Sequence, residues 1–284
     1  LRERGIEPFV TLWHWTLPIW VVRHGGWKSR KTIFHFSRFC RKVAEEFRHD
    51  IRFWIVLNEP GLWTSEAYLF GFKPPAKRNI IATGRAYFHL VRAHKEAYRA
   101  LKSVNTSFSV GISESGEWIE PRIIPRPVRY LFHYLRNYFF LKRIEGFFDF
   151  IGLNYYRRSA LMGPGGGAFS DMGWEVDPEG IYYRLRGFWQ RFHLPLFVTE
   201  NGIADARDEL RPKFIQDHIE EVMRARNDGI DVRGYFHWSL LDNFEWEEGF
   251  WPRFGLFEVD YRTMERKKRE SADVYADIIR NSKP

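Results

Sequence analysis

The stretch FVTENG, residues 197–202, runs from apolar residues typical of a buried strand straight into the carboxylate of Glu200. FWIVLNEP, residues 53–60, repeats the arrangement: five apolar residues are followed by Asn58, Glu59 and a proline. A carboxylate at the end of a core strand is costly, because a buried charge must be paired or hydrogen-bonded. The two stretches therefore predict two strands that each deliver a glutamate to a functional site.

Four further segments share this apolar, β-branched and aromatic character, so the sequence predicts six strands: residues 8–15, 53–58, 107–113, 148–156, 195–201 and 234–240. Most are apolar on both faces, which is typical of a parallel sheet covered by helices. Apolar spacings of three and four predict helices over residues 32–47, 80–101, 128–144 and 214–227, and a last one after Glu270. This alternation indicates βαβ units.

Polar or aromatic residues follow the predicted strands at their carboxyl ends: His14, Asn58, Glu59, Glu114, Asn154, Tyr156, Glu200, Asn201, Trp238 and Asp242. In a (β/α)8 barrel the catalytic residues lie at these ends. A nucleotide-binding sheet would also gather ligands there, but no strand leads into a GxGxxG or GxxxxGKS/T turn. We therefore predict one α/β domain over residues 1–284, a (β/α)8 TIM barrel of which about six βα units are visible.

The net charge of +8 would suit nucleic acid or an anionic membrane, but basic residues that solvate outer helices are the simpler explanation. Residues 126–143 interleave bases with aromatics and fit such a helix, with one apolar face formed by Leu131, Tyr134, Leu135, Tyr138 and Leu141. The apolar stretches are too short to span a bilayer. We expect neither a nucleic-acid partner nor a membrane span.

The single cysteine, Cys40, excludes an intrachain disulfide and fits a reducing compartment, so a cytoplasmic location is expected. The ten histidines include no HExxH or other metal-binding spacing. We expect no metal site and no cofactor. Glu114 and Glu117 are interpreted as solvated loop carboxylates, and the glycine-rich residues 163–169 as a loop.

Two carboxyl groups that face each other across a pocket can cleave a glycosidic bond: one protonates the leaving oxygen and the other attacks the anomeric carbon. At ~5 Å and an effective dielectric constant of ~20, two carboxylates repel by about 3 kcal/mol, or roughly two pKa units. From a reference pKa of about 4.3, one glutamate would stay protonated close to neutral pH while its partner is ionised. Glu59 and Glu200 are the candidates for this pair.

The residues around the strand ends suit a sugar ring, because tryptophans offer flat apolar faces and polar side chains pair with hydroxyl groups. The tryptophans are Trp13, Trp15, Trp63, Trp174, Trp238 and Trp246, and the polar residues are His14, Asn58, Asn154 and Glu245. For Trp13 and Trp54 a place in the core is the preferred interpretation.

Six motifs together resemble the retaining β-glycosidases of glycoside hydrolase family 1. They are LWHWTLP (12–18), LNEP (57–60), GLNYY (152–156), MGWEVDPEGIYYRL (172–185), VTENG (198–202) and HWSLLDNFEWEEGFWPRFGL (237–256). They occur in the family's order, and the last motif is long and highly specific. The resemblance covers essentially the whole chain and runs from what would be the family's third strand.

Carried over position by position, the resemblance implies that Glu200 is the nucleophile and Glu59 the acid/base. Asn58 would bind the sugar 2-hydroxyl, and His14 would hold another hydroxyl of the same ring, with Trp15 as a further substrate-binding residue. The remaining roles concern a hydrogen bond to the nucleophile and the surfaces around the sugar. Tyr156 would donate that bond with Asn154 beside it, Trp238 would form the floor, Glu245 and Trp246 would grip the 4- and 6-hydroxyls, and Trp174 would line the aglycone side.

The sequence departs from the family pattern at two places. Gly61 and Leu62 stand where the family usually has an aromatic residue after NEP, so that wall would be open or supplied by Trp63. The first two βα units are absent from the sequence, so we expect an N-terminally incomplete barrel with exposed edge strands at residues 9–14 and 234–239. Either a preceding segment of a longer protein, or a second chain, or a rearrangement is expected to cover these edges.

Two classes of function follow. The first is a hydrolase of the β-glucosidase type that acts in carbohydrate metabolism, removing a non-reducing terminal sugar through a glycosyl-enzyme. The second is a catalytically impaired barrel that binds a sugar or another ligand in the inherited pocket, or needs a missing segment for activity. Intact Glu59 and Glu200 favour the first, and the absent βα units favour the second.

Overall fold

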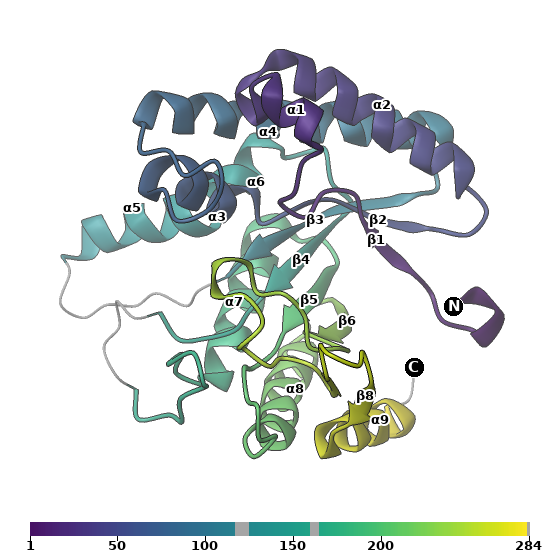
Figure 1. Ribbon diagram of the computed structural model, residues 1–284, viewed down its shortest axis with the longest axis vertical. Helices are drawn as coiled ribbons and strands as arrows, with labels where there is room; N and C mark the ends of the chain where they lie inside the picture. Colours follow the sequence, from purple (N-terminus) through teal and green to yellow (C-terminus); the bar gives the residue numbers. More distant parts are fainter. Residues whose placement is uncertain (117–124, 160–164, 283–284) are drawn as a thin grey trace. The chain divides into compact units, whose positions relative to one another are not determined.

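The computed structural model describes residues 1–116, 125–159 and 165–282 of the chain (Figure 1). The chain divides into two compact units. The N-terminal unit comprises Leu1–Ser115 and Leu131–Gly152, and the C-terminal unit comprises Gly116–Tyr130 and Leu153–Pro284. Glu117 lies outside the described residues. That the chain forms one domain stays a prediction.

The N-terminal unit alternates short parallel strands with helices. Its elements are the 3₁₀-helix η1 (Arg2–Arg4), β1 (Phe9–Thr11), α1 (Ile19–Arg23), the 3₁₀-helix η2 (Gly26–Lys28), α2 (Arg30–Glu46), β2 (Phe53–Asn58), α3 (Pro60–Thr64), the π-helical turn η3 (Ser65–Phe70), α4 (Ile80–Val104), β3 (Ser109–Ser115) and α6 (Phe139–Arg143). Helix α5 (Arg126–Asn137) and strand β4 (Phe150–Asn154) contribute to both units.

The C-terminal unit continues this order and ends in a hairpin and a helix. Its elements are α7 (Pro178–Phe192), β5 (Leu196–Asn201), α8 (Arg211–Asn227), β6 (Val232–His237), the 3₁₀-helix η5 (Trp246–Glu248), β7 (Phe257–Val259), β8 (Arg266–Lys268) and α9 (Glu270–Asn281). Strands β7 and β8 pair antiparallel.

The six predicted strands are all present, and they follow chain order from β1 to β6 in one sheet. The pairing is parallel: Phe9 lies opposite Phe53 between β1 and β2, and Leu196 lies opposite Val232 between β5 and β6. This is the strand and helix order of a (β/α)8 barrel, with about six of its βα units in the sequence. Strands β1 and β6 stand at the two ends of the order, as predicted for the edge strands.

Aromatic rings from β1, β2 and β4 pack together in the N-terminal unit. The Phe9 and Phe53 rings stack at 4.2 Å, and Phe150 meets both rings edge-on. Gly111 makes room for Phe150, because a Cβ at that position would lie 2.5 Å from the Phe150 ring. Helices α2 and α4 lie side by side (Figure 1). Cys40 of α2 is fully buried, and burial raises the pKa of its thiol.

Helix α7 was not among the predicted helices. The sequence does contain a helix start here, because Asp177 is the N-cap residue and Pro178 takes the first helical position, which proline favours. Buried Ile181, Leu185 and Phe188 then recur at helical spacing. Helices α7 and α8 lie side by side in the C-terminal unit (Figure 1).

The expected single helix over residues 128–144 is two helices, α5 and α6, which break at Tyr138. Its expected apolar face is only partly buried. Tyr138 and Leu141 are buried, whereas Leu131 and Leu135 are 58% and 49% exposed. Spacing alone identified the face of the helix but not how far along the helix the core extends.

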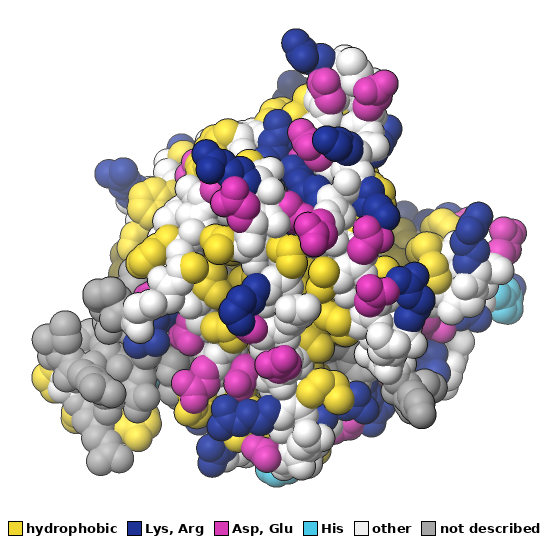
Figure 2. Space-filling view, turned by 90° about the horizontal axis from the view of Figure 1, so that it is seen from below, with side chains coloured by type: hydrophobic (Ala, Val, Ile, Leu, Met, Phe, Trp, Pro, Cys, Tyr) yellow, Lys and Arg dark blue, Asp and Glu magenta, His cyan; other side chains and the backbone are white. Residues whose placement is uncertain are grey.

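Basic side chains do not gather into a single patch on the face shown in Figure 2, where lysines and arginines are interspersed with aspartates and glutamates. Within the described residues, none of the helices combines the length and apolar character that crossing a membrane requires. The cytoplasmic location stays a prediction.

His94 of α4 makes the stability of the fold depend on pH. The ring is completely buried and its Nε2 lies 2.7 Å from the carbonyl oxygen of Phe147. Burial lowers the pKa of His94 to about 4. The unfolded chain, with a pKa of about 6.5, takes up the proton first, so stability is lost as pH falls from about 6.5 to about 4.

We expect His94→Gln to reduce this pH dependence, because glutamine keeps a donor for Phe147 but does not titrate. Between pH 6 and pH 5 the free energy of unfolding of the natural chain should fall by about 1 kcal/mol more than that of the variant. Urea unfolding at both pH values measures the difference. Equal slopes for the two proteins would contradict the role given to His94.

Candidate active site

Glu59 stands at a sharp turn between β2 and α3 in the N-terminal unit. Its φ and ψ of 44° and 51° are left-handed, a conformation that is strained for a residue other than glycine. The turn is held because the Glu59 amide donates to the carbonyl oxygen of Ser113 at 2.8 Å. Glu59 and Asn58 are 6% and 3% exposed. The strand end therefore presents a buried carboxylate with a fixed backbone.

The strand end of β1 meets the same turn. The Asn58 side-chain amide donates to Nε2 of His14 at 3.1 Å, and the Trp15 indole donates to the carbonyl oxygen of Asn58 at 3.1 Å. Burial lowers the pKa of His14 to about 4, so the ring is neutral at pH 7. Because Nε2 accepts, the ring proton resides on Nδ1. Four predicted site residues, His14, Trp15, Asn58 and Glu59, thus lie together.

Two tryptophans near this turn belong to the core. Trp13 is 4% exposed and packs edge-on against Trp27 and Trp63, and Trp54 is fully buried, so the core interpretation of Trp13 and Trp54 is confirmed. The prediction that Trp63 offers its face to a sugar is wrong. Trp63 is 4% exposed because its ring is enclosed by Trp13 and Tyr68.

The interpretation of Glu114 as a solvated loop residue is also wrong. Glu114 belongs to β3 and is 4% exposed. With Tyr87, Arg136 and Asn137 it lines a cavity of about 70 Å³. Burial, followed by the nearby charge of Glu114, raises the pKa of the Tyr87 hydroxyl. Both faces of β3 are buried at this end of the strand, which the short apolar run did not reveal.

Glu200 lies on β5 in the C-terminal unit, where the end of β4 is bound to it. The Tyr156 hydroxyl donates to Glu200 Oε2 at 2.6 Å, and the Tyr155 amide donates to the Glu200 carbonyl oxygen at 2.9 Å. Thr199 donates to Asn154 Oδ1 at 2.7 Å. The short charge-assisted bond from Tyr156 fixes the orientation of the Glu200 carboxylate.

Trp174 extends this cluster. Its ring lies 5.9 Å from the Tyr156 ring in edge-on geometry, and the Arg157 guanidinium lies 5.0 Å from the Trp174 ring centre. Glu175, the next residue, accepts bonds from the amides of Gly165 and Gly167 at 2.6 and 3.0 Å. The described part of the glycine-rich segment is therefore tied to the segment that carries Trp174.

Trp238 follows β6 and is joined to β5. Its amide donates to the carbonyl oxygen of Asn201 at 2.9 Å, and its peptide bond to Ser239 is cis. Gly202 permits this approach, because a Cβ there would lie 1.8 Å from the Trp238 carbonyl oxygen. The close approach of the Trp238 backbone therefore explains why VTENG ends in a glycine.

Glu245 and Trp246 lie on the loop between β6 and β7 and are half-buried. The Glu245 amide donates to the carbonyl oxygen of Gly249 at 2.7 Å, which closes the tip of the loop. Among the described residues, no group of three or more His, Cys, Asp or Glu side chains could hold a metal ion.

Parallel strands whose carboxyl ends carry two glutamates are what is expected of a glycoside hydrolase of the (β/α)8 class. The profile of glycosyl hydrolase family 1 matches residues 1–129 and 166–284. The chain belongs to this family, as the resemblance of its motifs predicted.

Curated relatives agree with this membership. The chain is 37% identical over 335 residues to a β-galactosidase of Sulfolobus acidocaldarius, covering 99% of this chain and 68% of the relative. It is 32% identical over 336 residues to β-glucosidase A of Thermotoga maritima, covering 99% of this chain and 75% of the relative.

Solved structures support the fold. A β-glucosidase from Thermotoga maritima in complex with azafagomine superposes with a TM-score of 0.92 at 30% identity, over 99% of this chain and 75% of that one. A β-glycosidase from Pyrococcus horikoshii superposes with a TM-score of 0.91 at 37% identity, over 98% of this chain and 72% of that one.

Gly202→Ala should destabilise the C-terminal unit, because the new Cβ collides with backbone atoms rather than with a movable side chain. We expect the free energy of unfolding to fall by about 2 kcal/mol or more, as measured by urea unfolding. Gly84→Ala in α4 is the matched control. A Cβ at this position would meet no neighbouring residue within 4 Å, so the substitution should raise the free energy of unfolding by about 0.5–1 kcal/mol. Similar effects at both positions would contradict the steric argument.

Proposed function

We propose that this protein is a retaining β-glycosidase that removes a non-reducing terminal hexose from a small β-glycoside. Glu200 is the nucleophile and Glu59 the general acid/base. The observation that carries the proposal is the 2.6 Å hydrogen bond from Tyr156 to Glu200 in a chain of this family. A donor on the carboxylate stabilises its ionised form, which is the form that attacks.

The proposed reaction has two steps. Glu200 attacks the anomeric carbon while Glu59 protonates the leaving oxygen, and Glu59 then removes a proton from the water that hydrolyses the glycosyl-enzyme. Retention requires carboxyl groups about 5–5.5 Å apart. The left-handed turn at Glu59 supports the role of acid/base, because a fixed backbone limits where the carboxyl group can reach.

Substrate recognition is proposed for the side chains around the two glutamates. Asn58 would bind the 2-hydroxyl, and its contact with the neutral His14 ring supports a paired arrangement for two neighbouring hydroxyls. Tyr156 would orient the nucleophile, with Asn154 beside it. The further contacts to sugar and aglycone are assigned to Trp15, Trp174, Trp238, Glu245 and Trp246.

Replacement of each glutamate should give a distinct kinetic result. Glu200→Gly should abolish glycosyl-enzyme formation, and added azide or formate should restore turnover with inverted product. Glu59→Ala should slow substrates with poor leaving groups by about 10²–10⁴-fold and affect good leaving groups far less. Rates with 4-nitrophenyl and alkyl β-glucosides measure both effects.

The exposed Glu258 provides the control, because Glu258→Ala removes a carboxylate outside the proposed site and should leave the rates unchanged. Equal losses for good and poor leaving groups in Glu59→Ala would refute its assignment as the acid. Sugar binding without turnover in the unaltered chain would favour the alternative of an impaired barrel.

The substrate is expected to be an unphosphorylated β-hexoside, a glucoside before a galactoside. The Glu245 carboxylate would repel a 6-phosphate, which carries about −1.5 to −2 charges, but would accept strong bonds from two hydroxyls. Arg253, the next cation along the chain, is engaged by Asp242 at 3.2 Å. Comparing 4-nitrophenyl β-glucoside with its 6-phosphate measures the preference, and faster turnover of the phosphorylated sugar would refute this role of Glu245.

A further inference from the structure

The segment from Ser239 to Phe257 forms a loop with a narrow neck. The two sides of the neck are joined by backbone hydrogen bonds of 2.8–3.2 Å, and residues 243–253 extend beyond it. The bonds run from Ser239 N to Phe254 O, from Leu256 N to Ser239 O, from Phe257 N to Leu240 O and from Asp242 N to Phe257 O. We call residues 243–253 the sugar loop, because they include Glu245 and Trp246.

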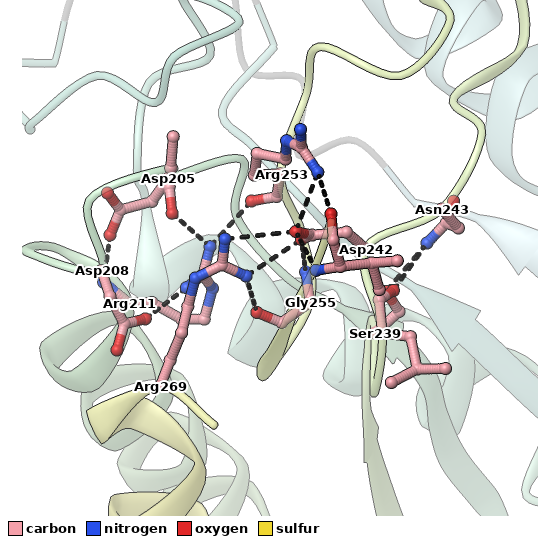
Figure 3. Close-up of polar contacts among 12 residues, drawn as sticks. Asp205, Asp208, Arg211, Ser239, Asp242, Asn243, Arg253, Gly255 and Arg269 are labelled. Carbon is pink, nitrogen blue, oxygen red and sulfur yellow. Dashed lines mark hydrogen bonds and ion pairs between the residues drawn. The ribbon is translucent and has the colours of Figure 1, made fainter. Parts of the chain in front are cut away.

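The Asp242 carboxylate sits inside the neck and is fully buried (Figure 3). It accepts bonds from the amides of Gly255 and Val259 at 2.9 and 3.2 Å. Two Arg269 nitrogens approach it at 3.0 and 3.2 Å, and Arg253 Nη1 approaches at 3.2 Å. A buried charge tolerates no loss of partners, so this geometry holds both sides of the neck in place.

The two sides of the neck are so close at Gly255 that no side chain would fit there. A Cβ on Gly255 would lie 2.2 Å from the Asp242 amide nitrogen and 2.4 Å from the Phe257 carbonyl oxygen. Arg269, which begins the approach to α9, also donates to the Gly255 carbonyl oxygen at 2.7 Å. The Arg269 guanidinium therefore binds the Asp242 side chain on one side of the neck and the Gly255 backbone on the other.

The neck is also fixed to the segment that follows Glu200. The Arg253 carbonyl oxygen accepts bonds from Arg211 Nη2 at 2.7 Å and from the Asp205 amide at 3.0 Å (Figure 3). Arg211 is fully buried at the start of α8. The end of the sugar loop thus shares its anchor with the chain just beyond the β5 strand.

The tip of the sugar loop, in contrast, is well exposed. Phe244, Phe250 and Trp251 are 52%, 50% and 49% exposed. Beyond the neck the loop contacts Tyr261, whose ring lies 4.5 Å from that of Phe250 and whose hydroxyl donates to the Asn243 carbonyl oxygen at 3.3 Å. A segment with so much of its apolar surface in water gains little more from packing, so the buried neck is its main anchor.

From these contacts we propose that Asp242 and Arg269 are a positioning pair for sugar specificity. By fixing the neck they hold Glu245 and Trp246 toward the hydroxymethyl end of the sugar, and so make the site prefer hexosides to pentosides, which lack that group. The proposal rests on the proposed function for the role of Glu245. It assigns Asp242 and Arg269 no contact with the substrate.

The position of the loop is tested by limited chymotrypsin digestion of the full chain. Asp242→Asn removes the charge that the arginines share, and cleavage after Phe244, Phe250 or Trp251 should become about 10-fold faster or more. Arg269→Lys keeps the charge but loses the two-pronged contact and should show the same change to a smaller extent. Asp273→Asn in α9 breaks an exposed ion pair with Lys268 of β8; it is the control and should be cleaved like the natural chain.

Specificity is tested by calorimetric binding of 1-deoxynojirimycin and of its analogue without the hydroxymethyl group. Asp242→Asn should weaken binding of the first ligand by about 10-fold and of the second by less than about 2-fold. The reason is that the loop contacts the hydroxymethyl group, which only the first ligand carries. Equal weakening of both ligands would show a general structural role and overturn the proposal, as would unchanged cleavage and binding.

The outcomes also separate this proposal from the proposed function. If the natural chain binds neither ligand, the proposed function fails and the specificity role fails with it, while the digestion still decides whether the pair positions the loop. If Asp242→Asn does not fold, Arg269→Lys carries both measurements, and an unchanged ratio of the two affinities in that variant overturns the proposal.

Discussion

A buried carboxylate is stable only where donors surround it, and this constraint determines much of the C-terminal unit. Asp242 is bound by two backbone amides and two arginines, which come from the loop after β6, from β7 and from the residue before α9. Breaking a buried ion pair by removing one partner typically destabilises a fold by about 3–5 kcal/mol. The elements that supply the partners are therefore specified together rather than one at a time.

The same constraint explains why the candidate site can be polar without weakening the strands that carry it. The backbone of Glu200 is hydrogen-bonded to Tyr155, and its carboxylate to Tyr156. The amide of Glu59 is bound to Ser113, so its left-handed turn does not depend on its own side chain. In both places the backbone is held by the neighbouring strand, which leaves the carboxyl group available for chemistry.

Period and composition were sufficient to predict the six strands, because runs such as residues 53–58 and 195–201 are apolar on both faces. They were insufficient where burial depends on a distant partner. Trp63 is enclosed by Trp13 and Tyr68, and Glu114 lines a cavity together with Tyr87 and Arg136, neighbours that no local pattern contains. The site residues were predicted from motifs, whereas the pairing of Asn58 with His14 required the folded chain.

Cys40 has a practical consequence. It is the single thiol of the chain, it is fully buried in α2, and its raised pKa keeps it in the unreactive protonated form. A cysteine introduced at an exposed position, such as that of Phe250, would be the only thiol open to a maleimide reagent. The natural sequence is thus already suited to single-site fluorescent labelling, with no background substitution needed to silence a native cysteine.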